Sequence, residues 1–402
     1  MTASRKRLLR IALVVIGALA VVAVGGIVHA VSAVAKRWEV PPPDVRAATS
    51  PAALARGEKI FRSTCIGCHG DEAGRATGKR MDDIPAFLGT FTASNITGHA
   101  SAGIGAWTDG DLARLVRFGV LRDGRRAVVM PTFEGLSDDD LAAVLAFLRS
   151  SDPLVTPQPV VRPRSQPSLV GKIILVYVSG VEPALGTAPT RAPAAAPTAE
   201  YGAYLANSVL HCFECHTEGF GRDKIHSPHA YAGGFELKDA RGRKILSANI
   251  TPDEATGIGR WTSAQFIRAL RDGVRPDGDI VRPPMPRMRA LDEVDLAAIY
   301  AYLRSVAPVR RTVERPAPRP GAPATDAAQA FVSYGCADCH APGAAFHDRL
   351  RAARGRPIEE VMERILTPEK FNPATEMPSF AGQLDEPTVR QLAEYVQSAF
   401  SP

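Results

Sequence analysis

The sequence Cys-x-x-Cys-His occurs three times in this chain of 402 residues. The three copies are Cys65, Cys68 and His69; Cys212, Cys215 and His216; and Cys336, Cys339 and His340. Together they use all six cysteines, so the sequence leaves none for a disulfide. Two thiols at this spacing can each form a thioether with one vinyl group of a haem, and the adjacent histidine then supplies the proximal ligand of the iron. The motif therefore predicts three covalently attached c-type haems.

Other uses of a Cys-x-x-Cys pair fit the sequence less well. A structural zinc site needs four ligands, and no second Cys-x-x-Cys pair lies within a finger-like distance of any copy. A thioredoxin-like exchange site does not require a histidine after the second cysteine, whereas that histidine is present in every copy here. We therefore expect haem c rather than zinc or dithiol exchange at all three motifs.

Methionine is the expected ligand on the opposite side of each iron. Three methionines are followed by proline, and one of them lies downstream of each motif: Met130, Met285 and Met377. A thioether sulfur suits haem iron and raises its potential relative to a nitrogen ligand. Proline has a fixed φ and no N–H, which stiffens the loop that must hold the sulfur. The alternative is that these residues are flexible core fillers. The predicted iron ligand pairs are His69 with Met130, His216 with Met285, and His340 with Met377.

The second motif has competing distal ligands. Met288 follows Met285 closely, but alignment of the repeats places Met288 opposite Phe133, so Met285 is preferred. Three histidines also occur in this region: His211, His226 and His229. The first abuts the motif and is not expected to reach the distal side, and the other two are expected to be exposed in a loop. Histidine–histidine ligation therefore stays open as the lesser alternative at this site.

The regions that follow the first two motifs are internal repeats. Asn95-Ile96-Thr97 recurs as Asn249-Ile250-Thr251, and eight residues after each asparagine comes Gly-Ile-Gly-x-Trp, ending at Trp107 and Trp261. A Gly-Val pair follows twelve residues after each tryptophan, and then Met-Pro and an apolar-periodic stretch. The third region lacks the Asn-Ile-Thr and Gly-Ile-Gly-x-Trp blocks. It is therefore predicted to be a shorter and different haem domain.

Helical patterns flank the motifs and predict an all-α fold. Apolar residues recur at helical spacing before the first motif, at Leu54, Gly57, Ile60 and Phe61. Helices with capping residues Ser137, Asp292 and Asp385 are predicted to close the three regions. Their buried stripes are expected at Leu141, Val144, Leu145 and Leu148; at Leu296, Ile299, Tyr300 and Leu303; and at Val389, Leu392 and Val396. We expect three cytochrome c-like domains in tandem, with each haem forming much of the hydrophobic interior.

Proline-rich spacers divide the predicted domains. The apolar run Leu169 to Val178 inside the first spacer is too short to span a bilayer, and we expect it to pack on a neighbouring domain. The predicted organisation is 1–40, cytoplasmic tail and membrane anchor or signal peptide; 51–156, first domain; 157–198, Pro-rich linker; 199–309, second domain; 310–323, Pro/Arg-rich linker; and 324–402, short third domain.

The N-terminus predicts export across the inner membrane. Four basic residues at positions 5–10 precede an uncharged apolar run from Ile11 to about Val34, which ends at Lys36-Arg37. This length fits a membrane helix and exceeds the apolar core of most cleavable signal peptides. The basic N-terminal tail is expected to stay in the cytoplasm, which places everything after the helix in the periplasm. Weak cleavage sites near Ala30 and Ala33 keep a signal peptide open as the alternative, and both alternatives export the haem domains.

Charge gives little further information about partners. The net charge of +6 is spread among acidic residues and forms no stripe of the kind that binds nucleic acid, so no nucleic-acid partner is expected. The arginines of the second spacer are most simply explained as a solvated linker. The expected partners are redox proteins, and the N-terminal helix contacts the membrane.

The block "SANITPDEATGIGRWT…RPPMPRM…LDEVDLAAIYAYLRS" and its copy in the first repeat resemble multihaem c-type cytochromes built from class I cytochrome c domains. The block looks like that of the membrane-bound cytochrome subunits of alcohol, gluconate and fructose dehydrogenases, and related membrane-anchored mono- and dihaem cytochromes carry it too. The resemblance covers roughly residues 51–309. It implies all-helical haem domains that transfer electrons from a dehydrogenase towards quinone, a soluble cytochrome or a terminal oxidase. It also implies that Trp107 and Trp261 lie near the haem. Each tryptophan then either contacts a haem propionate or is a plain core residue.

The chain departs from the dehydrogenase-subunit pattern in its short third region and its N-terminal anchor, which leaves the partner dehydrogenase undefined. We expect an electron carrier without catalytic residues. The alternatives are a peroxidase-like enzyme or a sensor, and both require an iron with an open distal position. Three methionines are available to fill the distal positions of the irons, which favours the carrier.

Overall fold

The structure is a computed structural model that describes residues 3–71, 73–82, 84–183, 185–186, 188–219, 221–314, 326–372 and 375–399. Helices dominate the described part of the chain, and the strands found there form two short antiparallel pairs. The all-α prediction is confirmed in its coarser form: the described part of the chain is mainly helical, with two short strand pairs that were not predicted.

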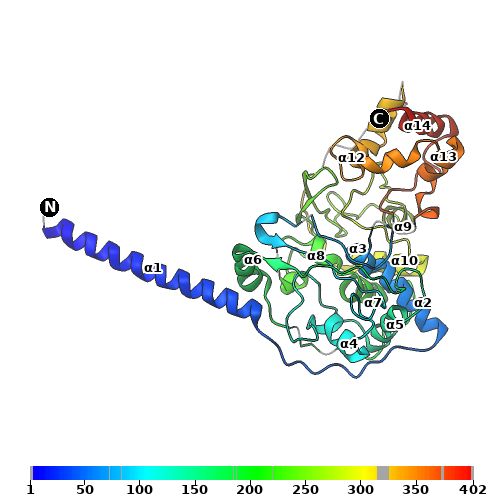
Figure 1. Cartoon of the computed structure of the whole chain (residues 1–402). Coiled ribbons are helices and arrows are strands. Elements are labelled where there is room, and N and C mark those ends of the chain that lie inside the picture. The colour runs from blue at the N-terminus through cyan, green and yellow to red at the C-terminus, as the bar shows by residue number, and fades with distance from the viewer. Residues whose placement is uncertain are drawn as a thin grey trace.

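A long N-terminal helix, α1 (Ala3–Ala35), extends away from the rest of the molecule (Figure 1). Its stretch Arg10–Ala35 has a mean hydropathy of 2.9 and is long and apolar enough to cross a membrane. Large apolar side chains along it are exposed, among them Leu13, Val21 and Val24. An apolar helix that leaves most of its large side chains exposed requires another apolar environment.

The first unit, residues 51–156, is built around two crossing helices. Helix α2 (Pro51–Ile60) leads through a π-turn, η1 (Phe61–Cys65), into α3 (Ile66–His69). After the short elements η2 (Ala86–Leu88) and β1 (Gly89–Thr90) come α4 (Asp109–Phe118) and α5 (Asp138–Leu148). Gly57 permits a close crossing of α2 over α5, since a Cβ there would lie 1.9 Å from the carbonyl oxygen of Ala143. Ser137 caps α5 as predicted, by accepting from the amide of Asp140.

The second unit, residues 199–309, repeats this arrangement. Helix α7 (Ala199–Tyr204) continues through a π-turn, η4 (Leu205–Val209), to α8 (Cys212–His216) and η5 (Arg222–His226). A hairpin of β3 (Glu236–Lys238) and β4 (Lys244–Leu246) precedes α9 (Ser263–Arg271) and α10 (Glu293–Ser305). Gly202 repeats the role of Gly57, because a Cβ on it would lie 1.9 Å from the carbonyl oxygen of Ala298. Asp292 caps α10 as predicted.

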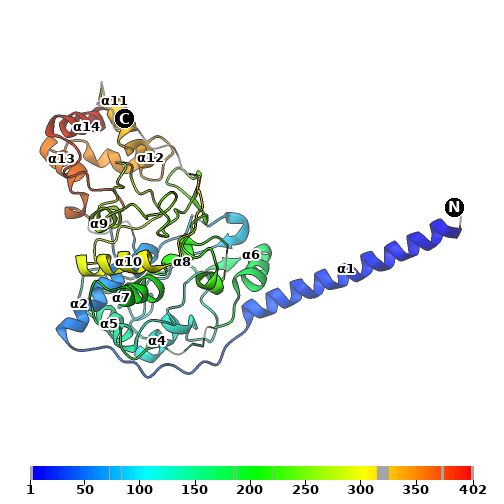
Figure 2. The same cartoon turned by 180° about the vertical axis from the view of Figure 1, so that it is seen from behind.

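The two repeats share one hydrophobic core. A single cluster of buried residues runs from Val45 to Leu303 and includes the stripes of both α5 and α10. Helices α2, α5, α7 and α10 lie together in both views (Figures 1 and 2). The predicted inward residues of α5 are all buried, as are those of α10 except Tyr300, which is half-buried. The helix predicted from Leu54, Gly57 and Ile60 is present as α2, with Leu54 in its first turn, beyond the crossing and 38% exposed.

The first spacer, residues 157–198, follows the surface of the first unit. Its strand β2 (Gln166–Pro167) pairs with β1, and the side-chain amide of Asn95 donates to the carbonyl oxygens of Gln158 and Val160, each at 2.9 Å. The apolar run of the spacer forms a short helix, α6 (Leu169–Ile174), and a π-turn, η3 (Leu175–Ser179). It packs against η2, as expected for contact with a neighbouring domain, and also against α1.

The third unit, in the C-terminal part of the chain, has its own hydrophobic cluster. Its elements are α11 (Ala327–Ser333), α12 (Cys336–His340), η6 (His347–Ala353), α13 (Ile358–Leu366), η7 (Pro368–Lys370) and α14 (Glu386–Ala399). Asp385 accepts from the amide of Thr388 at the start of α14, and Val389, Leu392 and Val396 are buried as predicted. Most of the predicted linker 310–323 lies outside the described residues.

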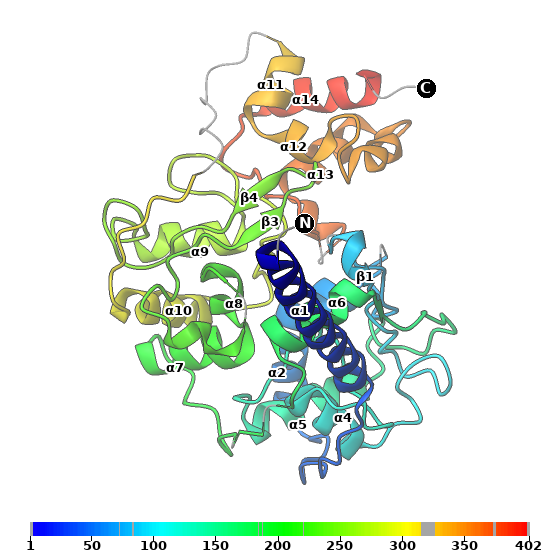
Figure 3. The same ribbon diagram turned by 90° about the vertical axis from the view of Figure 1, so that its left-hand side faces the viewer.

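The view along α1 shows how the units are arranged about this helix (Figure 3). The helices of the first, second and third units lie to different sides of the α1 axis, and α6 lies beside α1. The third unit borders the second through the β3–β4 hairpin and α12.

Candidate haem attachment sites

Each of the three motif histidines is oriented by a backbone carbonyl. The Nδ1 atom of His69 lies 2.8 Å from the oxygen of Ser94, that of His216 lies 2.8 Å from Ala248, and that of His340 lies 2.9 Å from Phe346. A carbonyl only accepts, so Nδ1 must carry the hydrogen in each ring. The Nε2 atom of a neutral imidazole then has a free lone pair, as a metal ligand requires.

In the first unit, the carbonyl of Ser94 is held in place by the Asn-Ile-Thr block that follows it. The side-chain oxygen of Asn95 accepts from the amide of Thr97 at 2.9 Å and from its hydroxyl at 2.7 Å. The amide nitrogen of the same side chain binds the spacer. The block therefore fixes the loop that orients His69. The recurrence of the block in the sequence indicates that it has a role, but its residue types do not show which role.

The second unit repeats these contacts at Asn249 and Thr251. The side-chain oxygen of Asn249 accepts from the amide of Thr251 at 3.0 Å and from its hydroxyl at 2.7 Å. Its side-chain nitrogen donates to the carbonyl of Val309 at 2.8 Å, just after α10. Ala248, which directly precedes this asparagine, accepts from His216. The third unit lacks the block and uses Phe346, six residues after His340.

The electrostatics of the motif side chains favour their neutral forms. Burial lowers the pKa of His69 and His216, although the hydrogen bonds to Ser94 and Ala248 oppose this change. Burial raises the pKa of the Cys65 and Cys212 thiols to about 12 and that of Cys339 to about 11. Reactive exchange cysteines and zinc ligands have lowered thiol pKa values instead. Within the described residues, no three His, Cys, Asp or Glu side chains gather in a way that could hold a metal ion.

The three Met-Pro methionines all lie partly buried against the hydrophobic clusters. Met130 and Met285 pack against the shared core of the first two units, and Met377 packs against the core of the third. Val129, directly before Met130, has a φ of 72°, which is rare for a β-branched residue. The surrounding contacts must enforce this loop conformation, because the isolated backbone does not favour it.

The competing side chains of the second unit occupy other places. Met288 is buried in the core, and its amide donates to Leu270 as the amide of Phe133 donates to Val116. Met288 is thus the structural counterpart of Phe133, as the repeat alignment indicates. His226 and His229 are exposed, and the His211 ring packs on Phe133 with centroids 4.8 Å apart.

The two tryptophans of the repeats are half-buried against the shared core. An arginine guanidinium lies over each ring, Arg122 at 5.7 Å from the Trp107 centroid and Arg275 at 5.9 Å from the Trp261 centroid. Both indole rings therefore combine core packing with a cationic neighbour.

The first and second attachment motifs lie close to each other. The hydroxyl of Thr64, next to Cys65, donates to the carbonyl of Val209 at 3.1 Å, just before α8. Phe133 of the first unit also packs on His211, which directly precedes Cys212. The attachment ends of these two sites therefore face each other across the shared core.

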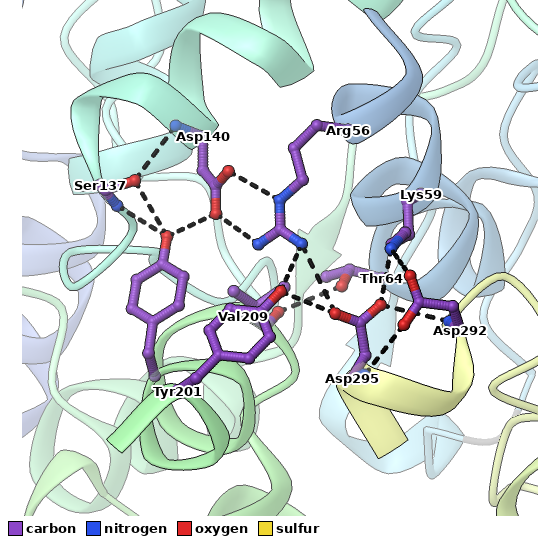
Figure 4. A network of polar contacts seen from close by, with 10 residues as sticks. Arg56, Lys59, Thr64, Ser137, Asp140, Tyr201, Val209, Asp292 and Asp295 are labelled. Atoms are coloured by element: carbon purple, nitrogen blue, oxygen red, sulfur yellow. Dashed lines mark hydrogen bonds and ion pairs between the residues drawn. The ribbon is translucent and has the colours of Figure 1, made fainter. Parts of the chain in front are cut away.

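Figure 4 shows the polar network that joins the helices of the first two units. Arg56 donates two hydrogen bonds to Asp140, at 2.8 and 2.7 Å, and a third to the hydroxyl of Tyr201 at 2.9 Å. Tyr201 donates in turn to Asp295 at 2.7 Å. Lys59 contacts Asp292 at 2.5 Å and Asp295 at 2.8 Å. The buried carboxylates Asp140 and Asp295 are thus each paired with a basic side chain at the interface between the two repeats.

The third motif contacts the second unit. Asp338, between the two cysteines of this motif, is buried and lies 3.2 Å from Arg243 and 3.2 Å from Arg282. Arg289 donates to the carbonyl of Met377 at 2.8 Å. Both the motif and the Met-Pro loop of the third unit therefore rest on the second unit. These contacts join distant parts of the sequence, and the sequence analysis did not predict them.

Known proteins with similar sequences are c-type cytochromes or their subunits. Residues 52–148 match the family described as cytochrome C oxidase, cbb3-type, subunit III. The chain is 30% identical over 272 residues to a "Diheme cytochrome c-type" protein of Cereibacter sphaeroides, covering 63% of this chain and 85% of that relative.

Two dehydrogenase subunits are also similar. Identity is 30% over 273 residues with the cytochrome c subunit of alcohol dehydrogenase (quinone) from Gluconobacter oxydans, covering 63% of this chain and 55% of that subunit. It is 37% over 135 residues with the fructose dehydrogenase cytochrome subunit of Gluconobacter japonicus, covering 33% of this chain and 26% of that subunit. The chain thus spans about half or less of these two relatives. The extended match to the dihaem cytochrome establishes that this chain belongs to the family of multihaem c-type cytochromes, related to the cytochrome subunits of alcohol and fructose dehydrogenases.

Proposed function

We propose that this chain is a membrane-anchored electron carrier of the periplasm that holds three c-type haems. The cysteines of the three motifs would form the thioethers, and His69, His216 and His340 would supply the proximal nitrogen ligands. Met130, Met285 and Met377 would supply the distal sulfur ligands. When bound, each haem supplies reversible one-electron chemistry at its iron. The protein needs no catalytic side chain for this function.

The observation that carries the proposal is the shared orientation of the three motif histidines. In each unit a backbone carbonyl 2.8–2.9 Å from Nδ1 leaves Nε2 available as a ligand. The six motif cysteines and the methionines on the cores complete a donor set suited to haem c. Zinc would instead require a converging four-ligand set.

The contacts between units support a series of three sites. The second site lies between the others, because Val209 contacts Thr64 next to the first motif and Arg282 contacts Asp338 in the third. Each neighbouring pair is held by hydrogen bonds or ion pairs. We propose that electrons pass through the three sites in this spatial order, in a direction set by the partners.

A dehydrogenase is the proposed electron donor. The support is similarity to proteins named as cytochrome subunits of quinone-linked alcohol dehydrogenase and of fructose dehydrogenase. Quinone, a soluble cytochrome or a terminal oxidase is the proposed acceptor class. The chain itself would serve as the electron-transfer subunit.

A haem count and a gas-binding test address this function directly. We expect three haems per chain in the purified protein, and a reduced visible spectrum that does not change when carbon monoxide is added. Closed irons with two protein ligands give this result. A change equal to one haem's signal would reveal an open iron and would favour the peroxidase-like or sensor alternative instead.

Two neighbouring methionines of the second unit provide a matched pair of variants. Met285→Ala is expected to let one haem bind carbon monoxide and to lower its potential, while attachment stays intact. Met288→Ala should lower stability by about 2–5 kcal/mol as a core truncation and leave the irons closed. The reverse pattern would assign the sulfur ligand to Met288. Met130→Ala and Met377→Ala test the other two sites in the same way.

The proposed anchor can be tested on the full-length chain. The intact mass of protein purified from membranes should include residues 1–35. Alkaline carbonate should not release the protein from membranes. A mass lacking this segment would identify a cleaved signal peptide. The periplasmic location of the haem sites does not depend on this outcome.

A further inference from the structure

The helix α6 and the π-turn η3 present an apolar surface beside the membrane helix. Four large apolar residues on them are about half exposed: Leu169, Val170, Tyr177 and Val178. Leu169 and Val170 precede Tyr177 and Val178 by eight residues. The two pairs therefore lie about two turns apart on similar sides of the helix. Phe87 on the adjoining η2 is also exposed. We call these five residues the interfacial patch.

The contact between Tyr177 and α1 fixes the position of this patch along the axis of α1. The Tyr177 hydroxyl donates to the carbonyl of Gly26 at 3.0 Å, and the Nδ1 atom of His29 lies 2.8 Å from the same hydroxyl. The rings of Tyr177 and His29 also pack with centroids 5.6 Å apart. Figure 3 shows α6 beside α1, which agrees with these contacts.

The length of α1 places this contact at the outer edge of the hydrocarbon layer. A bilayer core about 30 Å thick is crossed by about 20 helical residues. Counted from Ile11, the first residue after the last N-terminal charge, Gly26 lies about 23 Å and His29 about 27 Å along the helix at 1.5 Å per residue. Tyr177 therefore meets α1 within the core boundary.

The residues that follow α1 mark the headgroup level. Lys36 and Arg37 end the apolar segment, and the Lys36 ammonium lies 3.7 Å from the centre of the Trp38 ring. Tryptophan and basic residues concentrate at the membrane–water interface. Since Gly26 and His29 precede Lys36 by seven to ten residues, the Tyr177 end of the patch lies on the membrane side of this level.

We infer that the interfacial patch inserts into the outer leaflet and forms a second membrane contact, with lipid acyl chains as its partner. This inference rests on the proposed membrane anchor. Burial in lipid would remove the exposed apolar surface from water and would orient the haem units relative to the bilayer. A single spanning helix would otherwise leave the units free to rotate about its end.

Spin labelling of single cysteines in the full-length protein tests the inference. All six natural cysteines belong to the attachment motifs, so an introduced cysteine is the one thiol left in the haem-loaded chain. The test positions are Val170→Cys and Val178→Cys on the patch. Val161→Cys, 78% exposed in the spacer, is the aqueous control, and Val21→Cys on α1 is the lipid control. The labelled proteins are reconstituted into phosphatidylcholine vesicles, with haem content checked for each.

The readout is collision of the nitroxide with oxygen, which concentrates in lipid, against collision with a water-soluble nickel chelate. We expect both patch labels and the Val21 label to collide more with oxygen, and the Val161 label to collide more with nickel. Patch labels that behave like Val161 while Val21 remains in lipid would overturn the inference and leave the anchor intact. An aqueous Val21 label would overturn the anchor and the inference together.

Discussion

The Nδ1 atom of His69 lies 2.8 Å from the carbonyl oxygen of Ser94, the residue directly before Asn95. His216 and Ala248 stand in the same relation directly before Asn249. The Asn-Ile-Thr block therefore has two roles: it holds the carbonyl that orients the motif histidine, and it binds the chain segment that follows the last helix of its unit. This connection explains why the block accompanies the first two motifs, whereas the third histidine uses the carbonyl of Phe346 instead.

Asn95→Ala should disturb the first haem site alone. The substitution removes four hydrogen bonds and leaves buried donors and acceptors unpaired, at a cost of about 1–3 kcal/mol for each unsatisfied group. We expect a lower urea midpoint and a shift of one of three components in a redox titration. Asn249→Ala is the matched variant and should shift a different component. A shift of the same redox component in both variants would contradict the proposed role of the block.

Gly57→Ala should destabilise the first unit, because the new methyl group would overlap the carbonyl of Ala143. The backbone of α5 cannot move aside without disturbing the shared core, so we expect a loss of at least about 1–3 kcal/mol in unfolding free energy. Gly202→Ala should behave alike at Ala298. Gly186→Ala is the control, since its added methyl group meets no atom within 4 Å and should change stability by less than about 0.5 kcal/mol. Equal stability of the Gly57 and Gly186 variants would disprove the close crossing.

Asp338→Asn should loosen the third unit from the second. Arg243 and Arg282 would each lose a charged partner, worth about 1.5–3 kcal/mol for a hydrogen bond to a charged group. The Ala345 amide, which donates to Ala240 across this interface, should exchange its hydrogen at least about tenfold faster, since 1.4 kcal/mol corresponds to a factor of ten. Asp348→Asn, at an exposed ion pair with Arg351, is the control. Unchanged exchange at Ala345 in the Asp338 variant would show that the pair does not hold the interface.

Alkaline pH should weaken the interface between the first two units. Burial raises the pKa of Tyr201 and Tyr204 above the ordinary value of about 10, and the neighbouring carboxylates Asp295 and Asp140 act in the same direction. The unfolded chain then loses these protons first, so the stabilisation is complete below about pH 10 and declines above it. Urea unfolding between pH 8 and 11 should show this decline. Tyr204→Phe should make the unfolding free energy depend less on pH. A dependence as steep as that of the unchanged protein would show that the Tyr204 phenol does not cause the decline.

The sequence predicted the parts of the structure that side-chain patterns encode. Capping residues such as Ser137 and Asp292 and the apolar stripes they precede depend on local rules, and the structure agrees with them. The helical spacing before the first motif predicted α2, but spacing alone does not show where another helix crosses, and Leu54 is exposed beyond that crossing. The counterpart relation of Met288 and Phe133 followed from repeat alignment, which carries three-dimensional information that one copy lacks.

Other features left no signature that a single sequence reveals. The partners of the motif histidines are backbone carbonyls, which every residue possesses, so Ser94 and Phe346 could not be singled out by type. The pairs Arg56–Tyr201 and Arg243–Asp338 join residues from different units, and arginine and aspartate are frequent everywhere on surfaces. The wrapping of the first spacer around its unit depends on Asn95, whose role emerges only from the folded contacts.

The placement of the three units around the axis of α1 has a consequence for the route of electrons (Figure 3). With α1 upright in the bilayer, the units lie next to one another over the membrane surface, and the path through them runs parallel to that surface. For the three-haem carrier proposed above, such a path would carry electrons sideways, along the membrane surface, between its proposed redox partners. The distance that it bridges is then set by the width of the protein in the membrane plane.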